Sequence, residues 1–197
     1  IKEENERWAL YRTPGGMQAL PDAFAKRLSV QLGTPVHEVS AGKEITVQTD
    51  KGEEQYDMAV LATPAPITLG MYKNPTEKQK EVLAETHYAA TMSVSFVVEK
   101  AQLPDYSVVW VPYVESQKIS GFVNESMKGE EVIRDGKTPI SVWLHEEFAR
   151  IIMQESGEKI FIAVKEELLK LCPWLSSDTM GNHDLQRWPL AMPKFSP

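Results

Sequence analysis

Glycine spacing gives the first indication of the chemistry that the chain can support. A pyrophosphate site in a dinucleotide-binding fold needs Gly-x-Gly-x-x-Gly between a strand and a helix, because the glycines let backbone N–H groups reach the phosphates. None of the 11 glycines stands in such a motif. The pair Gly15-Gly16 precedes a segment with helical spacing, where it suits either a simple turn or close approach to a bound cofactor. The sequence therefore carries no complete dinucleotide cradle.

Metal-binding and nucleophilic spacings are also missing. His145-Glu146-Glu147 is not followed by the second histidine of the zinc motif His-Glu-x-x-His, so a solvent-exposed helix start is expected there. The single cysteine, Cys172, ends an apolar helical segment, which favours a buried and inert thiol. We therefore expect no metal site, and side-chain spacing assigns no catalytic residue.

Composition and charge exclude several function classes. The chain has 197 residues, of which 42% are hydrophobic, enough to bury a substantial core. Its formal net charge of −7 and its pI near 5.2 argue against binding to nucleic acid, which attracts basic surfaces. No apolar stretch approaches the roughly 18 residues that span a bilayer, although peripheral membrane contact stays open. No export signal is visible and one cysteine fits a reducing compartment, so we expect a cytoplasmic protein.

Apolar spacing predicts an amphipathic helix near the start of the chain. The helix would cover Gly15–Leu28 in about three turns, with Pro21 in its first part, where a missing N–H costs little. Residues three and four apart share one helical face, and here that face consists of Met17, Leu20, Phe24 and Leu28.

Short strands are expected to follow this helix. The turn cluster Asp50-Lys51-Gly52 suits a hairpin, and the continuous apolar run Ala59–Ala62 predicts a strand buried on both faces. Thr63–Pro66 would end that strand, because proline cannot donate to a ladder. The β-favouring runs before it are Val36–Val39, Ile45–Thr49 and Glu54–Tyr56.

The remainder of the chain predicts an α+β fold, with a mixed or antiparallel sheet and helices packed on it. Asn74 and Pro75 suit the start of a short helix that runs to about Glu85. Strict alternation over Ala90–Val98 predicts a strand with one buried face. Further strands are expected at Val108–Val114, Ile119–Val123 and Ile140–Leu144, and further helices at Phe148–Met153 and Phe161–Leu171.

Two stretches of the chain resemble a known flavoprotein group. Residues 15–66, with a glycine pair, an amphipathic helix, short strands and a Pro-rich turn, resemble the second flavin-domain segment of FAD-dependent amine oxidases, protoporphyrinogen oxidases and carotenoid desaturases. Residues 183–197, with a Trp, an Ala-x-Pro and an aromatic residue, are similar to the segment that returns to the flavin domain. The resemblance implies a fragment: an incomplete flavin-domain segment over residues 1–66, a substrate-binding domain over 67–184 and a return segment over 185–197.

The same resemblance implies contacts with FAD in the intact protein. Gly15 and Gly16 would lie where the flavin and substrate domains meet, and the backbone of Val36 would meet the adenine ring. Further contacts would come from the turn residues Ala62, Thr63 and Pro64 and from Trp188. From the residues alone, an ordinary core or turn role also accounts for these positions, and the tryptophans at 110, 143 and 174 are expected in the core. Because the main cradle is absent, this segment alone is not expected to retain FAD.

One departure from the family pattern bears on the substrate. Many amine oxidases carry a lysine near the flavin N5 on a substrate-domain strand, and the matching strand here, Thr91–Phe96, has none. This difference favours the side of the group that takes large apolar substrates. The cavity lining expected from the strand and its neighbour is Met92, Val94, Phe96 and Trp110, whereas the opposite strand face, with Thr91, Ser93 and Ser95, is the alternative.

The resemblance thus implies part of an FAD-dependent oxidoreductase. The intact enzyme would transfer a hydride from a C–N or C–C bond of an apolar small-molecule substrate to FAD, and this segment alone would be inactive. The alternative is a non-catalytic binding or interaction domain that kept the fold. A strand, Gly-x-Gly-x-x-Gly and a helix encoded upstream of Ile1 would favour the enzyme.

Overall fold

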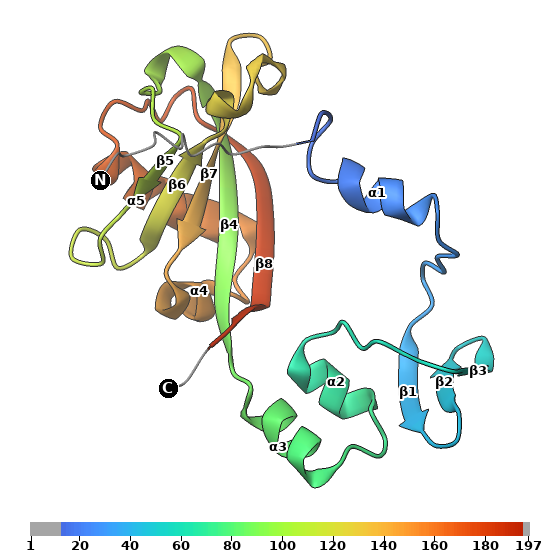
Figure 1. Cartoon of the computed structure of the whole chain (residues 1–197). Helices are drawn as coiled ribbons and strands as arrows, with labels where there is room; N and C mark the ends of the chain where they lie inside the picture. Colours follow the sequence, from blue (N-terminus) through green and yellow to red (C-terminus); the bar gives the residue numbers. More distant parts are fainter. Residues whose placement is uncertain (1–12, 195–197) are drawn as a thin grey trace, which may run out of the picture. The chain divides into compact units, whose positions relative to one another are not determined.

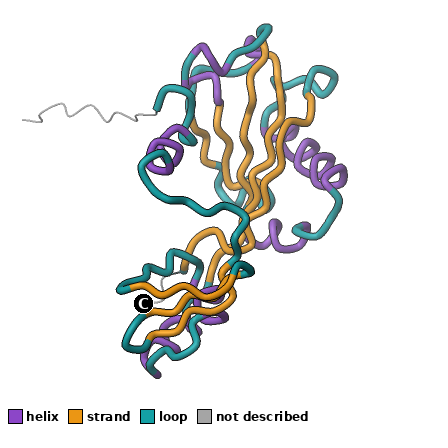
Figure 2. The backbone as a smooth tube through the Cα atoms, turned by 90° about the vertical axis from the view of Figure 1, so that its right-hand side faces the viewer, coloured by secondary structure: helices purple, strands orange, loops and turns teal. Residues whose placement is uncertain are grey.

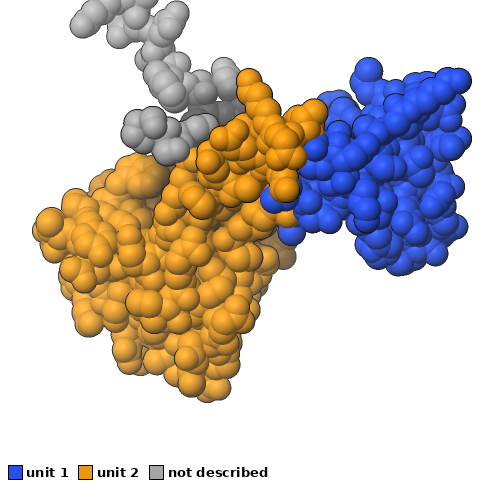
Figure 3. Space-filling view, turned by 90° about the horizontal axis from the view of Figure 1, so that it is seen from below, with its two compact units in different colours: residues 1–62, 67–75 blue, residues 63–66, 76–197 orange. Residues whose placement is uncertain are grey.

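The computed structural model of the chain describes residues 13–194. These residues belong to two compact units, one drawn from residues 1–62 and 67–75 and the other from residues 63–66 and 76–197 (Figure 3). The first unit contains a three-stranded sheet and the second a five-stranded sheet with helices (Figure 1). Residues 1–12 and 195–197, which include the ends of the first and last predicted segments, lie outside the described residues.

The sheet of the first unit is an antiparallel meander of β1 (Val36–Ala41), β2 (Ile45–Thr49) and β3 (Gly52–Tyr56). Thr49 pairs with Gly52 across a two-residue turn, which confirms the predicted hairpin. Gly52 has a φ of 121°, a backbone conformation that favours glycine.

Helix α1 (Ala19–Ala25) is shorter than the predicted helix over Gly15–Leu28. The amides of Arg27 and Leu28 bond to carbonyls three residues back instead of four, which tightens the chain and ends the helix. The apolar face that the spacing predicted is exposed in the described chain and is not part of its core. The exposed fractions are 61% for Met17, 46% for Leu20, 61% for Phe24 and 64% for Leu28.

The predicted buried strand at Ala59–Ala62 does not form. This segment is irregular, and Val60 is 84% exposed. An apolar run becomes a buried strand only where neighbouring strands satisfy its backbone, and the described residues supply none here. Helix α2 (Ala65–Met71), which the sequence did not predict, begins directly afterwards. Pro66 falls in its first turn, where proline is tolerated.

Helix α3 (Glu77–Glu85) starts at a different cap from the one predicted. Thr76 is the N-cap residue, and its side chain and that of Gln79 form a reciprocal capping box. Asn74 instead bonds to the backbone of Ala41: its Oδ1 accepts the amide N–H at 2.9 Å, and its amide nitrogen donates to the carbonyl. The predicted end near Glu85 is confirmed.

The second unit is built on a five-stranded antiparallel sheet with the order β5-β6-β7-β4-β8 (Figure 2). Its strands are β4 (Tyr88–Glu99), β5 (Val108–Trp110), β6 (Ile119–Asn124), β7 (Lys137–Leu144) and β8 (Gly181–Pro193). Its other helices are α4 (Glu146–Ile152), α5 (Gly157–Leu171) and the short 3-10 turns η1 (Lys100–Gln102), η2 (Glu125–Lys128) and η3 (Glu130–Val132).

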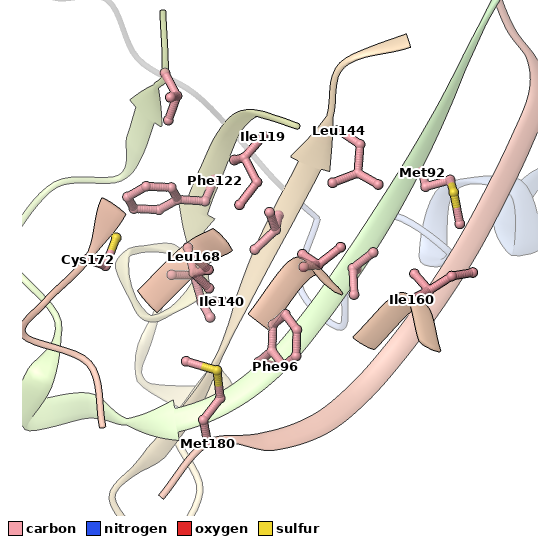
Figure 4. Close-up of a cluster of buried hydrophobic side chains, with 14 of the residues drawn as sticks. Met92, Phe96, Ile119, Phe122, Ile140, Leu144, Ile160, Leu168, Cys172 and Met180 are labelled. Carbon is pink, nitrogen blue, oxygen red and sulfur yellow. The ribbon is translucent and has the colours of Figure 1, made fainter. Parts of the chain in front are cut away.

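The core of this unit lies between one face of the sheet and helix α5 (Figure 4). Alternate residues of β4 are fully buried, and Phe96 meets the Phe161 ring edge-to-face with centroids 5.6 Å apart. The α5 residues that complete the cluster are spaced by four, as one helical face requires; they are Ile160, Val164 and Leu168. The predicted α+β fold, an antiparallel sheet with helices packed on it, is confirmed.

The edge strands differ from the predictions. The strand expected over Val108–Val114 ends at Trp110, shortly before Pro112, and Val114 is 90% exposed. At the other edge, residues 185–193 of the predicted return segment 185–197 lie in the 13-residue strand β8, which pairs with β4. The connection of this segment to a flavin domain stays a prediction. Register shifts interrupt this pairing near Ala89 and again near Ser95.

Two phenylalanines test how burial determines stability. Phe96 is 0% exposed and Phe24 is 61% exposed. We expect Phe96→Ala to lower the free energy of unfolding of its unit by about 3–5 kcal/mol. Phe24→Ala, an equal truncation on an exposed face, should change stability by no more than about 0.5 kcal/mol. Denaturant unfolding of both variants gives the comparison, and similar losses in the two would contradict the placement of the core.

A partly buried carboxylate, that of Glu167, predicts part of the acid sensitivity. Ser116 Oγ donates to Glu167 at 2.8 Å, and Lys170 Nζ lies 3.3 Å from the same carboxylate. Burial acts to raise the pKa of Glu167, but the bonds from Ser116 and Lys170 outweigh it and hold the pKa below its ordinary value. Because the folded pKa is the lower one, this carboxylate stabilises the fold above the unfolded pKa of about 4.3 and loses that contribution as pH falls.

We therefore expect Glu167→Gln to flatten the decline of unfolding free energy between about pH 5 and the acid limit of folding. Glu166→Gln is the control, because Glu166 lies on the same helix and is exposed. Identical pH slopes in Glu167→Gln and in the parent chain would show that the Ser116–Glu167 contact does not stabilise the carboxylate.

Candidate functional site

The second unit presents two chemically different sheet faces. Helix α5 packs on the face that carries the alternate apolar residues of β4. The opposite face carries small hydroxyl side chains and tryptophans, and it is partly exposed. Its β4 residues are Thr91, Ser93 and Ser95, and cross-strand pairing adds Ser141, Trp143, Asp184, Gln186 and Trp188.

The residues predicted to bind substrate fall on both faces. Met92, Val94 and Phe96 are 0% exposed and belong to the core under α5. Trp110 lies on the other face and is 71% exposed, so the structure does not bring it together with those three. Alternation identified two faces correctly but could not tell which one the helices cover. The role of these residues in substrate binding stays a prediction, and the alternative, hydroxyl-bearing face of β4 is the more accessible one.

Two tryptophans form a pair on the accessible face. The ring centroids of Trp110 and Trp143 are 5.5 Å apart with an interplanar angle of 48°. Gly121 pairs with both residues, because it lies opposite Trp110 in β5 and opposite Trp143 in β7. A Cβ at Gly121 would lie 2.7 Å from the Val109 carbonyl oxygen and 3.5 Å from the Trp110 ring. Glycine is therefore what lets the β5 backbone at Val109 lie this close to β6, whereas the 3.5 Å distance to the Trp110 ring is an ordinary contact.

Hydroxyl groups lie beside this pair on β4 and β7. Ser95 and Ser141 share a hydrogen bond of 3.1 Å, and Thr91 donates to the Leu144 carbonyl at 3.1 Å. Ser93 lies opposite Trp143, and its hydroxyl has no side-chain partner among residues 13–194. It is thus a hydrogen-bonding group next to an aromatic surface and available to a ligand.

The prediction that the tryptophans other than Trp188 are core residues is wrong for two of them. Trp110 is 71% and Trp174 is 45% exposed. Trp110 and Trp174 line the same shallow cavity of about 580 Å³ beside β5. The signal that was missed is Gly121, since a glycine inside a strand marks the close approach of another group.

The positions expected to contact FAD are distributed over both units. Gly15 and Gly16 have φ values of 81° and 92°, and no atom lies within 4 Å of a Cβ added at either one. Val36 and Ala62, in the first unit like the two glycines, are exposed, Val36 by 41%. Thr63 and Trp188, in the second unit, are exposed as well, Trp188 by 51%. Pro64 is half-buried. Contact of these residues with FAD stays a prediction.

Cys172 and His145, the remaining residues considered for nucleophilic or metal chemistry, occupy structural positions. Cys172 is buried, as expected, and burial raises the pKa of its thiol to about 12, which keeps it protonated and unreactive. His145 is the N-cap residue of α4, which confirms the predicted helix start, and its ring meets Tyr113 edge-to-face at 5.0 Å. Among residues 13–194 no three potential ligands gather at a metal-binding distance, and no helix there could cross a membrane.

Comparison with solved structures places the fold in the flavoprotein oxidase class. A putative protoporphyrinogen oxidase from Exiguobacterium sp. 255-15 is similar with a TM-score of 0.76 and 18% identity, over 92% of this chain and 40% of that chain. Wild-type putrescine oxidase bound to putrescine gives 0.68 and 18%, over 88% and 38%. Reduced UDP-galactopyranose mutase gives 0.70 and 14%, over 91% and 40%. The chain thus spans well under half the length of these proteins.

The family model of flavin-containing amine oxidoreductases matches residues 2–194. The chain belongs to this family. A search of curated proteins found no match. Members of the family contain flavin, which agrees with the predicted FAD requirement of the intact protein.

The packing of Trp110, Gly121 and Trp143 can be tested by adding a Cβ at Gly121. We expect Gly121→Ala to push the Val109 carbonyl, and with it the strand that carries Trp110, away from β6 and to destabilise the second unit by roughly 1–3 kcal/mol, as overpacking does. Gly181→Ala is the control, because Gly181 is in β8 of the same sheet and has no atom within 4 Å of an added Cβ. Thermal unfolding and tryptophan emission are the measurements, and unchanged emission with unchanged stability would contradict the close packing.

Proposed function

We propose that the chain forms the substrate-binding domain and part of the flavin domain of an FAD-dependent oxidoreductase. Residues 1–66 would belong to the flavin domain, residues 67–184 to the substrate domain, and residues 185–197 to the segment leading back. The intact enzyme would remove a hydride from a C–N or C–C bond of a small molecule.

The observation that carries this proposal is the accessible sheet face of the second unit. It combines the Trp110–Trp143 pair with the unpartnered hydroxyl of Ser93, while the other face is closed by α5. A ligand site needs apolar surface and a few placed polar groups, and this face supplies both. The non-catalytic alternative lacks a comparable observation in its favour.

The chain's own part in the reaction is to bind and orient. FAD, when bound, supplies the hydride acceptor. The backbone at Gly15-Gly16 and the exposed turn at Ala62–Pro64 would hold one side of the dinucleotide. The tryptophans would exclude water from the substrate, and the Ser93 hydroxyl would fix its orientation. None of these groups needs to act as a nucleophile, because orientation and exclusion of water are the main requirements of hydride transfer.

The substrate proposed is bulky and apolar, not a simple amine. Strand β4, Tyr88–Glu99, contains no lysine, and the accessible residues of its central part are hydroxyl-bearing. The Trp110–Trp143 pair itself carries no charge that would hold an ammonium group. The carboxylate on the same face, Asp184 opposite Ser95, already accepts hydrogen bonds of 3.2 Å from the Gln186 side chain. Similar folds occur both in a putative protoporphyrinogen oxidase and in putrescine oxidase. The chemistry of this face favours the former kind of ligand.

Anaerobic stopped-flow reduction of FAD in the longer protein that contains this segment tests the proposal. We expect a porphyrinogen to reduce the flavin faster than putrescine or a simple primary amine. Ser93→Ala should slow reduction by about tenfold if its hydroxyl orients the substrate, whereas Ser120→Ala, whose hydroxyl donates to the Trp143 carbonyl at 3.2 Å, is the control. Rapid reduction by putrescine and none by porphyrinogen would overturn the choice of substrate. Purification of the longer protein without flavin would overturn the enzyme assignment.

A further inference from the structure

A second cavity lies at the far end of the accessible sheet face. Its volume is about 550 Å³, and β4 and β7 contribute the apolar residues Val97 and Pro139. Both alternate with core residues and therefore lie on the same sheet face as Ser93 and Trp143. The polar part of the lining includes Arg134, Lys137 and His183. The cavity therefore lies on the same sheet face as the proposed substrate surface, but its lining contains charged residues.

Backbone geometry holds two cations of this lining together. Arg134 and Lys137 exchange backbone hydrogen bonds of 2.8 and 2.9 Å across a two-residue turn. The central residues Asp135 and Gly136 have φ values of 51° and 74°, as a type I′ turn requires. The Gly136 carbonyl also accepts a 2.8 Å bond from the Lys100 amide, which anchors the turn to the end of β4. Arg134 and Lys137 are therefore direct cross-strand neighbours on a fixed turn.

Two like charges placed directly opposite each other are unfavourable unless an anion lies near them. Glu99 compensates the positive charge of Lys137, because its carboxylate lies 3.6 Å from Lys137 Nζ. Arg134 has no ion-pair partner among the described residues, although it lines a cavity. Asp135 and Glu131 also line this cavity, so its overall charge is balanced and a multiply charged ligand would gain little. One carboxylate is the anion that suits a single free guanidinium.

Two further features lead to the same cavity. The register of β8 against β4 shifts between Ser95 and Phe96, which makes His183 the extra residue of a bulge. Bulges redirect side chains, and His183 lines the cavity. Val132, from the 3-10 turn η3, adds a third apolar residue to the lining. Thr138 lies between Lys137 and Pro139, but it pairs with the core residue Val98 and its side chain belongs to the core face.

We propose that this cavity is a carboxylate subsite, in which Arg134 binds the carboxylate of an amphipathic ligand while Val97, Val132 and Pro139 contact the adjoining hydrocarbon. The inference rests on the proposed function, because the subsite lies on the proposed substrate face and gives the bulky apolar substrate an acidic end. Asp135 weakens the site and limits it to one negative charge. Binding involves no covalent step and requires no flavin.

Calorimetric titration of this chain with octanoate and with the neutral isostere octanamide tests the subsite. We expect octanoate to bind at least about tenfold more tightly, because a charge-assisted bond to Arg134 is lost in the amide. Arg134→Gln should remove that difference without changing the affinity for octanamide. Asp135→Asn should strengthen octanoate binding, and asparagine tolerates the positive φ at this position. Arg27→Gln is the matched control, because Arg27 is exposed and lies in the other unit.

Amide chemical-shift changes in the labelled chain locate the bound ligand. Shifts at Gly136, Thr138 and His183 would support the subsite. Equal affinity for octanoate and octanamide, unchanged octanoate binding in Arg134→Gln, or shifts confined to other regions would overturn it. Flavin reduction by an uncharged bulky substrate in the longer protein would still support the proposed function. Failure of the subsite is therefore distinguishable from failure of the enzyme assignment.

Discussion

The strand β4 constrains nearly every other feature of the second unit. It pairs with β7 on one side and β8 on the other, so its 12 residues fix the register of three strands at once. Met92, Val94 and Phe96 face the core, which places Thr91, Ser93 and Ser95 on the other side. A slip of one residue would bury hydroxyls and expose Phe96, so the core and the accessible face are set by the same alternation. Packing of α5 against the apolar face stabilises the sheet that presents the hydroxyl groups.

The first unit shows what happens where such a packing partner is missing from the described chain. Helix α1 has the spacing of an amphipathic helix, yet Phe24 is 61% exposed and no residue of the helix is buried. Val60 and Met58 are 84% and 80% exposed after β3. Local spacing determined where the apolar residues gather, but burial depends on surfaces that spacing does not specify. Exposed apolar residues of this kind mark surfaces that are suited to association.

Sequence patterns predicted the second unit better than the first, for a physical reason. Strict alternation over residues 90–98 and the four-residue spacing of Ile160, Val164 and Leu168 each describe an element whose partner is in the same unit. The run Ala59–Ala62 has a strand pattern but no neighbouring strand to pair with. Asn74 is not the helix cap that was expected, because Thr76 and Gln79 form a capping box two residues later. For the candidate site, sequence identified Trp110 and the hydroxyls but not their common face with Trp143. That relation depends on register, which Gly121 makes possible.

Register also relates the aromatic and cationic ends of the accessible face. Ser93, opposite Trp143, and Val97, at the cavity, are four residues apart on β4, which corresponds to about 13 Å at the usual rise of a strand. A ligand that places a ring on Trp143 and a carboxylate beside Arg134 must extend over that length. A short diamine cannot reach both ends, and it carries the wrong charge for Arg134. The two ends thus select against the same molecules, one by offering an uncharged aromatic surface and the other by presenting a fixed cation, so discrimination against small amines would not depend on either end alone.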